Sequence, residues 1–298
     1  MENSQEKRPN LTSPRQVQQL MAKYQVAPKK GLGQNFLADA NILRKIVDAA
    51  ELSATDVVLE IGTGVGALTT ALAQTAGQVI TVETDRTLAP LLGEVLAGRD
   101  NVQLIFGDIL KHDPATLLPS AATAPKAVAN LPYYITTPII FHLLEADVCW
   151  QRLVFLVQKE VADRMVSPPG NKVYGALSVM IQSYCRVELV GVVPPTVFIP
   201  KPKVRSAIVK LTPQPRKFSP ETERCFSLLV RTVFSSRRKN LYNSLRPIFP
   251  QLGGEANVMA ALETLGFDPQ QRGETLSPKE FYALADHCGK NLQGLSKT

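Results

Sequence analysis

The stretch DVVLEIGTGVGALTT, residues 56–70, passes from a short apolar run through three closely spaced glycines into a helix-like segment. An almost wholly apolar run of this length is typical of a strand buried on both faces. Gly62, Gly64 and Gly66 allow a tight turn in which a ligand can approach the backbone closely. Because Gly62, Gly64 and Ala67 also satisfy the relaxed dinucleotide pattern G-x-G-x-x-G/A, the loop alone does not identify the ligand.

Similar apolar runs alternate with helix-like segments further along the chain. The strand-like runs are QVITVE, VQLIFGD, KAVANL and RLVFLVQ, and the helix-like ones are ALTTALAQTA, TLAPLLGEVLA and TPIIFHLLEA. This alternation predicts a parallel sheet that is covered by helices on both faces. A later pair, RVELVGVV and SAIVKLTP, predicts two further strands, which the stiff stretch PPTVFIPKPKV connects.

Helices are expected on both sides of this alternating region. Ser13 as a cap and Pro14 at the first helical position predict a helix that runs to Tyr24. Asp39 caps a second predicted helix, whose apolar face consists of Ile42, Ile46, Val47 and Ala50. After residue 212, PQPRKFSP resembles a linker and the remainder has helical periodicity. We therefore expect an N-terminal tail and helix over residues 1–30, an α/β domain over 31–212 and a helical domain over 213–298.

Positive charge is unevenly distributed along the 298 residues, whose net charge is +7. Residues 201–246 contain 12 Lys and Arg against two acids, and residues 1–45 contain eight against three. Such segregation indicates a polyanionic partner, although basic helix faces that only meet solvent are a common alternative.

The residue types offer no sign of a metal site or of a membrane segment. The four cysteines and three histidines lie far apart, without Cys-x-x-Cys or another metal-ligand spacing. No uncharged apolar run reaches 18 residues, and no signal peptide opens the chain. We expect a reduced, cytoplasmic protein with no metal and no membrane partner.

Two carboxylates are expected at the same sheet edge as the glycine loop. Glu83 ends QVITVE, 21 residues after Gly62, and suits ribose hydroxyls, while Asp108 ends VQLIFGD and can accept from an adenine amine. S-adenosylmethionine has no pyrophosphate and needs no anion cradle, so acids near its sulfonium are tolerable. The loop and the two acids therefore favour a nucleoside cofactor, with S-adenosylmethionine preferred. An NAD dehydrogenase would need a catalytic His or Tyr/Lys pair, which the scattered histidines do not supply.

The stretch VANLPYYIT, residues 128–136, places an amide and two aromatic rings at the end of the next strand. The Asn130 side-chain carbonyl and the Leu131 backbone carbonyl can each accept an N–H bond from an amine on a flat ring and orient its lone pair. Pro132 stiffens the turn and biases Leu131 toward an extended conformation. Tyr133 can stack on a flat, amine-bearing ring. An ordinary strand exit with a core tyrosine is the plainer alternative.

Several stretches together resemble the ribosomal RNA adenine N6,N6-dimethyltransferase family, most closely its bacterial members that act on small-subunit rRNA. They are GLGQNFL, LEIGTGVGALT, VETD, GDIL, NLPYYIT, QKEVADRM, YGALSVM, VFIPKPKV and FSSRRKNL, within residues 31–241. NLPY and FIPKPKV together are specific, whereas the glycine loop is not. The resemblance implies a Rossmann-like class I S-adenosylmethionine-dependent methyltransferase with a mainly parallel seven-stranded sheet and a small all-helical, RNA-binding C-terminal domain.

The resemblance also implies a reaction and a partner. The expected reaction methylates the exocyclic N6 of two adjacent adenosines in the 3′-terminal hairpin loop of 16S rRNA, giving N6,N6-dimethyladenosines. The expected partner is small-subunit rRNA within a pre-30S particle, so that methylation by a monomeric enzyme is coupled to ribosome biogenesis.

Roles for individual residues follow from the same resemblance. The expected catalytic residues are Asn130, Leu131, Pro132, Tyr133 and Phe198, with the Phe198 ring on the opposite face of the flipped adenine from Tyr133. The expected cofactor residues are Asn35, Leu37, Gly62, Gly64, Glu83, Asp108 and Asn130. The expected RNA-binding residues are Lys201, Lys203, Arg205, Arg237, Arg238 and Lys239. Tyr134 is expected to be structural. Loop packing for Asn35 and Leu37, and a hydrophobic plug for Phe198, are the alternatives.

Three other functions remain open from the sequence. A resistance-type dimethyltransferase of large-subunit rRNA would share the cofactor and NLPY-like motifs, but FSSRRKNL and the KEVADRM and YGALSVM stretches favour the small subunit by resemblance. A non-catalytic RNA-binding assembly or transcription factor would not need an intact amine pocket. A DNA adenine methyltransferase would need a target-recognition region, and none is evident.

Overall fold

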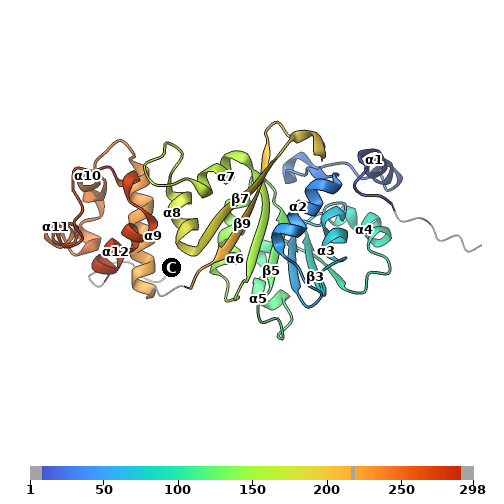
Figure 1. Cartoon of the computed structure of the whole chain (residues 1–298), viewed down its shortest axis with the longest axis horizontal. Helices are drawn as coiled ribbons and strands as arrows, with labels where there is room; N and C mark the ends of the chain where they lie inside the picture. The colour runs from blue at the N-terminus through green and yellow to red at the C-terminus, as the bar shows by residue number, and fades with distance from the viewer. Residues whose placement is uncertain (1–8, 216–218, 290–298) are drawn as a thin grey trace, which may run out of the picture. The chain divides into compact units, whose positions relative to one another are not determined.

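The computed structural model describes residues 9–215 and 219–289. The described residues group into two compact units, one within Met1–Ala162 and Glu188–Pro213 and the other within Asp163–Val187 and Gln214–Thr298 (Figure 1). This grouping differs from the expected domain boundaries in two respects. Residues 163–187 pack with the C-terminal helices, and the described part of the expected N-terminal segment belongs to the first unit. The ends of the expected tail and of the C-terminal domain, and residues 216–218 of the expected linker, lie outside the described residues.

A seven-stranded sheet with the order β4-β3-β2-β5-β6-β9-β7 forms the core of the first unit. The strands are β2 Val57–Ile61, β3 Gln78–Glu83, β4 Val102–Phe106, β5 Lys126–Asn130, β6 Arg152–Gln158, β7 Cys185–Val193 and β9 Ser206–Pro213. Strands β2 to β6 pair in parallel, and β9 is antiparallel to β6. All seven predicted strands are thus confirmed, as is the mainly parallel sheet.

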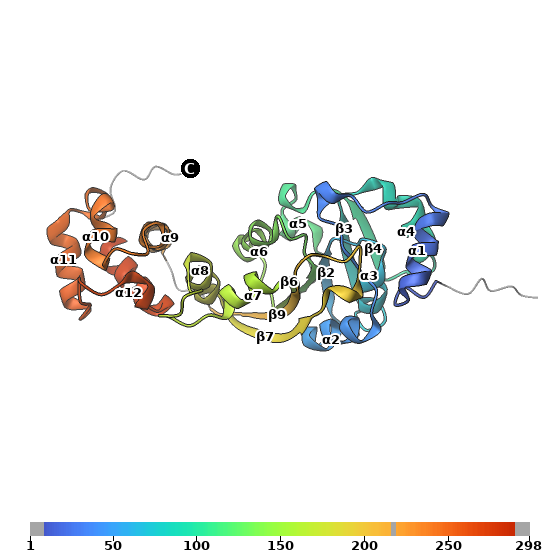
Figure 2. The same ribbon diagram turned by 90° about the horizontal axis from the view of Figure 1, so that it is seen from above.

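Helices cover the sheet on both faces, as its apolar strands require. In Figure 2, α2 lies on one side of the strands and α5 and α6 lie on the other. The interior strand β6 buries every residue between its two ends, because neither face meets water. The helices are α1 Pro14–Lys23, α2 Ala40–Ala50, α3 Ala67–Leu72, α4 Ala89–Val95, α5 Pro114–Leu117, α6 Thr136–Glu145 and α7 Lys159–Val166.

The predicted helix cap at Asp39 is confirmed. Its carboxylate accepts hydrogen bonds from the backbone N–H groups of Asn41 and Ile42, at 2.9 and 3.0 Å, which satisfies two of the free donors at the start of α2. The helix buries Leu43 and leaves Val47 only partly buried, so the predicted apolar face is rotated slightly. Ser13 precedes α1 as expected, but its side chain makes no capping hydrogen bond.

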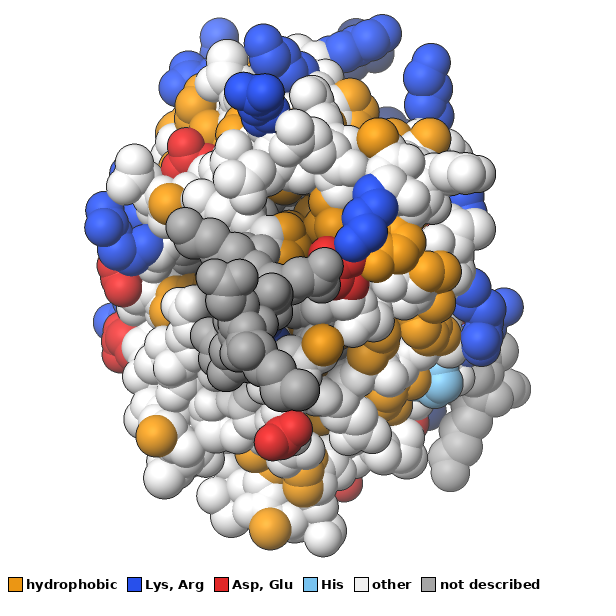
Figure 3. Space-filling view, turned by 90° about the vertical axis from the view of Figure 1, so that its right-hand side faces the viewer, with side chains coloured by type: hydrophobic (Ala, Val, Ile, Leu, Met, Phe, Trp, Pro, Cys, Tyr) orange, Lys and Arg blue, Asp and Glu red, His pale blue; other side chains and the backbone are white. Residues whose placement is uncertain are grey.

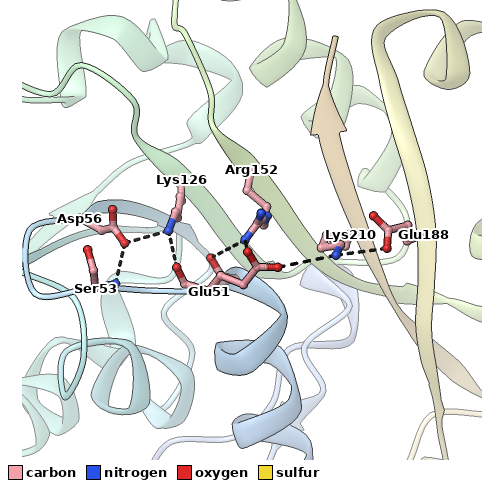
Figure 4. A network of polar contacts seen from close by, with 8 residues as sticks. Glu51, Ser53, Asp56, Lys126, Arg152, Glu188 and Lys210 are labelled. Carbon is pink, nitrogen blue, oxygen red and sulfur yellow. Dashed lines mark hydrogen bonds and ion pairs between the residues drawn. The ribbon is translucent and has the colours of Figure 1, made fainter.

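A network of charged residues fastens the C-terminal end of α2 to the first residues of β5 and β6 and continues to β9 and β7 (Figure 4). The Lys126 ammonium donates to the Glu51 backbone carbonyl at 2.6 Å and lies 2.8 Å from the Asp56 carboxylate. Arg152 lies 2.5 Å from the Glu51 carboxylate, and Lys210 lies 3.2 Å from Glu188. Cations at a helix C-terminus offset the negative end of its dipole, so this edge of the sheet is stabilised by pairing.

A second, two-stranded pairing joins two loops that are far apart in sequence. Strand β1 Phe36–Leu37 runs antiparallel to β8 Phe198–Ile199, with Phe36 opposite Ile199 and Leu37 opposite Phe198. Short 3-10 turns adjoin these loops and the strand ends: η1 Lys30–Leu32, η2 Arg86–Leu88, η3 Ile109–Lys111 and η4 Pro195–Val197. The pairing brings the GLGQNFL and VFIPKPKV motifs together.

The second unit is helical. It contains α8 Ala176–Tyr184, α9 Pro220–Ser235, α10 Leu241–Leu245, η5 Arg246–Ile248, η6 Pro250–Leu252, α11 Glu255–Thr264, η7 Gly273–Thr275 and α12 Pro278–Gly289. Phe226, Leu229 and Phe281 lie in its buried core. The Tyr174 hydroxyl donates to the Leu276 carbonyl at 2.8 Å, which ties the loop before α8 to the C-terminal helices. Within residues 9–215 and 219–289, no helix is both long and apolar enough to cross a bilayer.

Candidate active site

One pocket in the first unit lies at the carboxyl ends of β2, β3 and β5. It is lined by Leu32, Gln34, Asn35, Phe36, Ile61, Gly62, Gly64, Val82, Glu83, Thr84, Asp108, Ile109, Asn130, Leu131, Pro132, Tyr133, Tyr134, Ile135 and Ile139. Ligands of open α/β sheets bind at this edge, where parallel strands end together. The pocket gathers the predicted residues of the glycine loop, both acidic strand ends and the NLPY turn.

The glycine loop adopts a conformation that side chains disfavour. Gly62 and Gly64 have φ angles of +83° and +56°, in the left-handed region where a Cβ is strained. A Cβ at Gly64 would also lie 3.0 Å from the Phe36 ring. The loop therefore needs glycine, both for its backbone angles and for the space beside Phe36.

The Glu83 carboxylate braces this loop from the end of β3. Its two oxygens accept hydrogen bonds from the backbone N–H groups of Gly64 and Asp85, both at 2.8 Å. Burial raises the pKa of Glu83, and the backbone N–H bonds oppose that rise. The side chain is thus held in place with its remaining lone pairs beside the pocket. Asp108 is less constrained and caps η3 by accepting from the Leu110 N–H at 3.1 Å.

Residues 29–35, which we call the strap, are attached to Asp85 at the border of the pocket. The Lys29 ammonium and the Gln34 amide donate to the two Asp85 oxygens at 2.6 and 3.0 Å. Burial favours a higher pKa for Asp85, but hydrogen bonds from Lys29, Thr87 and Gln34 outweigh it and lower the pKa to about 2. Asp85 therefore carries a charge that holds the strap near both of its ends, through Lys29 and Gln34. This role was not predicted from the sequence, although Asp85 lies within the VETD motif.

The NLPY turn closes the opposite side of the pocket. The Asn130 side chain donates from Nδ2 to the Asn35 carbonyl at 3.0 Å. Leu131 is 1% exposed and donates its N–H to the Leu156 carbonyl at 3.1 Å. The Tyr133 hydroxyl lies 2.6 Å from the Ser206 hydroxyl, and burial raises its pKa. All three residues are anchored to neighbouring elements, so the turn is a rigid part of the site.

Two predicted residues lie outside the main pocket. Leu37 lines a smaller adjoining hollow together with Gly62, Gly64 and Asn130. Phe198 is 2% exposed and lies in the hydrophobic core, because β8 pairs with β1 and turns its ring inward. The structure does not bring the Phe198 ring to the pocket, and its expected stacking on a base stays a prediction.

The predicted RNA-binding residues fall in both units. Lys201, Lys203 and Arg205 are exposed in the first unit, in the segment that begins directly after β8. Figure 3 shows Lys and Arg side chains gathered along the upper margin of one face. In the second unit, Arg238 and Lys239 are exposed. Arg237 is exposed too, but it forms an ion pair with Glu274 at 2.8 Å and donates to the Lys172 carbonyl at 2.9 Å.

One buried acid beneath the glycine loop was not singled out from the sequence. Glu60 is fully buried, accepts a hydrogen bond from the Thr69 hydroxyl at 2.6 Å, and has a second oxygen without a partner. Burial raises its pKa to about 8, so the carboxyl group is mainly protonated at neutral pH. Its only sequence signal is an acid within an otherwise apolar strand.

The chemistry of the pocket fits a nucleoside that carries a positive centre. Its described lining includes two carboxylates and several aliphatic side chains, but no Lys or Arg. A pyrophosphate would favour a cation or a long row of N–H donors, whereas a sulfonium is compatible with nearby acids. No group of three or more His, Cys, Asp or Glu with metal-binding geometry occurs in the part of the chain that the structure describes.

The seven-stranded sheet, the glycine loop and the acidic strand ends define a class I S-adenosylmethionine-dependent methyltransferase. A family model for ribosomal RNA adenine dimethylase matches residues 26–288, and the chain belongs to that family. The predicted family, enzyme class and cofactor are therefore confirmed.

Individual relatives agree with this assignment. The chain is 46% identical to a ribosomal RNA small subunit methyltransferase A from Moorella thermoacetica over 285 residues, which cover 93% of this chain and 98% of the relative. It is similar to the crystal structure of a dimethyladenosine transferase from Plasmodium falciparum, with a TM-score of 0.72, 30% identity, and coverage of 83% and 95% of the two chains. The crystal structure of the 23S rRNA methyltransferase ErmE gives a TM-score of 0.66 at 29% identity, with coverage of 85% and 99%.

Proposed function

We propose that the protein transfers methyl groups from S-adenosylmethionine to N6 of two adjacent adenosines in the 3′-terminal hairpin loop of small-subunit rRNA. The observation that carries the proposal is the NLPY turn at the end of β5, which shares one pocket with the glycine loop and Glu83. A small-subunit target is supported by the 46% identity to a relative named for that subunit, against 29% for the 23S enzyme.

The proposed cofactor contacts are distributed over three strand ends. The Glu83 carboxylate would accept from ribose hydroxyls, and Asp108 from the adenine amine. Asn35 and the backbone of Gly62 and Gly64 would contact the rest of the molecule, with Leu37 behind them. When bound, S-adenosylmethionine supplies an electrophilic methyl group.

The NLPY turn would orient the target amine. With its Nδ2 engaged by the Asn35 carbonyl, the Asn130 amide leaves Oδ1 as its acceptor. Oδ1 and the Leu131 carbonyl would each accept one N–H from the adenine amine, and the nitrogen lone pair would then point away from both acceptors. Pro132 keeps the turn rigid, and Tyr133, anchored by Ser206, would stack on the base. No side chain is assigned as a general base, since positioning supplies most of the rate.

Exposed basic residues would hold the RNA backbone. Lys201, Lys203 and Arg205 follow β8, and β8 pairs with β1, whose Phe36 lines the pocket. They would therefore contact phosphates close to the target nucleotide, while Arg238 and Lys239 would contact phosphates of the same RNA from the helical unit. We propose that the enzyme acts as a monomer on a pre-30S particle in the cytoplasm.

The test incubates the purified protein with labelled S-adenosylmethionine and unmethylated small subunits, and maps modified nucleosides by mass spectrometry. N6,N6-dimethyladenosine at two adjacent positions of the 3′-terminal hairpin loop is expected. Large subunits serve as the competing substrate, and Asn130→Ala as the inactive control. Modification of large subunits in place of small ones would contradict the proposal.

A further inference from the structure

Tyr134 lies at the pocket with most of its ring in solvent. It lines the pocket together with Asn130, Pro132 and Tyr133, yet 57% of its surface is exposed. Among the described large hydrophobic side chains that are exposed, it is the single aromatic one. Its neighbour Tyr133 is mostly buried and bonded to Ser206, so the two tyrosines have different environments.

The Tyr134 ring packs against the strap. Gly33 has a φ angle of +58°, and a Cβ there would lie 3.2 Å from Cδ1 of Tyr134. The Asn35 amide donates to the Gly33 carbonyl at 3.0 Å, which holds this part of the strap in place. On the other side, the Ile135 N–H and the Thr136 hydroxyl both donate to the Pro132 carbonyl, at 3.2 and 2.9 Å. The backbone that carries the ring is therefore fixed, and one edge of the ring is covered by glycine.

Burial does not account for an aromatic residue at this site. An exposed ring leaves apolar surface in water, which costs free energy that packing elsewhere must offset. Within the described residues, the Tyr134 hydroxyl also has no hydrogen-bond partner. An exposed aromatic ring that lines the pocket, beside a strap that carries the exposed Lys30, has the composition of a single-stranded nucleic-acid site.

We infer that Tyr134 stacks on the base of the nucleotide that flanks the target adenosine in the RNA. The inference rests on the proposed function, because it takes an RNA adenine to be the group in the pocket. Since the two proposed target adenosines are adjacent, the flanking base in one round of methylation is the target of the other. Tyr134 is then a substrate-positioning residue that acts on RNA affinity and leaves cofactor binding unchanged.

The test compares Tyr134→Ala with Tyr134→Phe and Tyr134→Trp, which keep a ring. One aromatic–base stack contributes about 1–3 kcal/mol, so Tyr134→Ala should raise KM for unmethylated small subunits about 5- to 150-fold. The Phe and Trp variants should stay within about twofold of the unmodified protein, because both retain an aromatic face. S-adenosylmethionine affinity, measured by calorimetry, should be unchanged in all three. Leu189→Ala is the matched control, because Leu189 is also exposed (43%) but does not line the pocket.

A fluorescent RNA separates this inference from the proposed function. In the 3′-terminal hairpin with 2-aminopurine beside the target adenosine, binding of the unmodified protein should quench the fluorescence, and Tyr134→Ala should bind without that quenching. Equal quenching by Tyr134→Ala, or an unchanged KM, would overturn the stacking role while the methylation of subunits stands. A loss of S-adenosylmethionine affinity in Tyr134→Ala would also overturn it. Absence of any subunit methylation by the unmodified protein would instead refute the proposed function, and the quenching would still report on the stack.

Discussion

Asn130 and Asn35, which lie 95 residues apart in the chain, are joined by a hydrogen bond of 3.0 Å from the Asn130 Nδ2 to the Asn35 carbonyl. The bond connects the NLPY turn to the strap and determines the orientation of the carboxamide. The amide nitrogen can only donate, so the side-chain oxygen is the atom that can accept from a substrate amine, and the bond to Asn35 fixes where that oxygen points. One contact thus links the two motifs expected to bind the adenine and the cofactor.

Replacing Asn130 with Ala should abolish most methyl transfer. The substitution removes the proposed Oδ1 acceptor, and loss of one such positioned group lowers kcat by about 10²–10³-fold. Single-turnover methylation of small subunits measures the effect, and RNA affinity should stay within a few-fold. Asn41→Ala, at an exposed position on α2, is the matched control. Full activity of the Asn130 variant would remove the residue from the mechanism.

Replacing Glu83 with Gln should weaken the binding of S-adenosylmethionine. A hydrogen bond to a charged group contributes about 1.5–3 kcal/mol, so the Kd should rise about 10- to 150-fold. The Gln side chain also cannot accept from both backbone N–H groups that the carboxylate holds. Isothermal calorimetry measures the Kd, with Glu94→Gln as the control, because Glu94 bonds to Lys23 and Tyr24 and does not line the pocket. An unchanged Kd would show that Glu83 does not contact the cofactor.

Replacing Asp85 with Asn should loosen the strap. The neutral amide loses the ion pair with Lys29, so KM for S-adenosylmethionine should rise by about 3- to 10-fold, with a smaller change in kcat. The carboxylate has a pKa lowered from 3.8 to about 2. Its contribution to stability is therefore fully present above pH 3.8 and is lost only as the pH falls toward 2. Steady-state kinetics at pH 7 measure KM, and Lys29→Met should reproduce the effect. Equal kinetics in both variants and the parent would rule out a role for the strap.

Replacing Glu60 with Gln should stabilise the protein most at high pH. The folded state keeps the Glu60 proton up to about pH 8, whereas the unfolded chain releases it near 4.5. The free energy of unfolding should therefore fall as pH rises between these values, by at most about 1.4 kcal/mol per pH unit. Gln cannot ionise, so its advantage over the parent should grow from pH 5 to pH 8. Urea unfolding at several pH values tests this, and a constant difference would show that Glu60 does not titrate in this range.

Replacing Arg238 and Lys239 with Gln should change the salt dependence of RNA binding. In a plot of the logarithm of the RNA binding constant against the logarithm of the salt concentration, each phosphate contact contributes about 0.7–0.9 to the magnitude of the slope. The double variant, which loses two contacts, should therefore have a slope that is smaller in magnitude by about 1.4–1.8. Arg237→Gln should flatten it less, because Arg237 is paired with Glu274. Filter binding of small-subunit RNA over about one decade of salt, from about 50 to about 500 mM, measures the slope. A larger effect from Arg237 would mean that its ion pair opens in the complex.

The local pattern of apolar residues and glycines in the sequence was sufficient to predict the sheet and much of the pocket. Each apolar run is continuous in the sequence. Gly62 and Gly64 directly follow the first run, and Glu83 ends the second. Parallel strands bring their carboxyl ends to one edge, so a correct strand order by itself places Gly62, Glu83 and Asn130 together. These predictions needed only strand periodicity and the direction of the strands.

Only the tertiary structure decided the contacts between distant loops. The pairing of β1 with β8 turns the Phe198 ring into the core, and the strap is attached to Asp85 by Lys29 and Gln34. The pairing of Arg237 with Glu274 and the exposure of Tyr134 are also set by neighbours far away in the chain. A two-residue pairing, an ion pair or a buried face depends on which side chains fold against each other, and no local period encodes that choice.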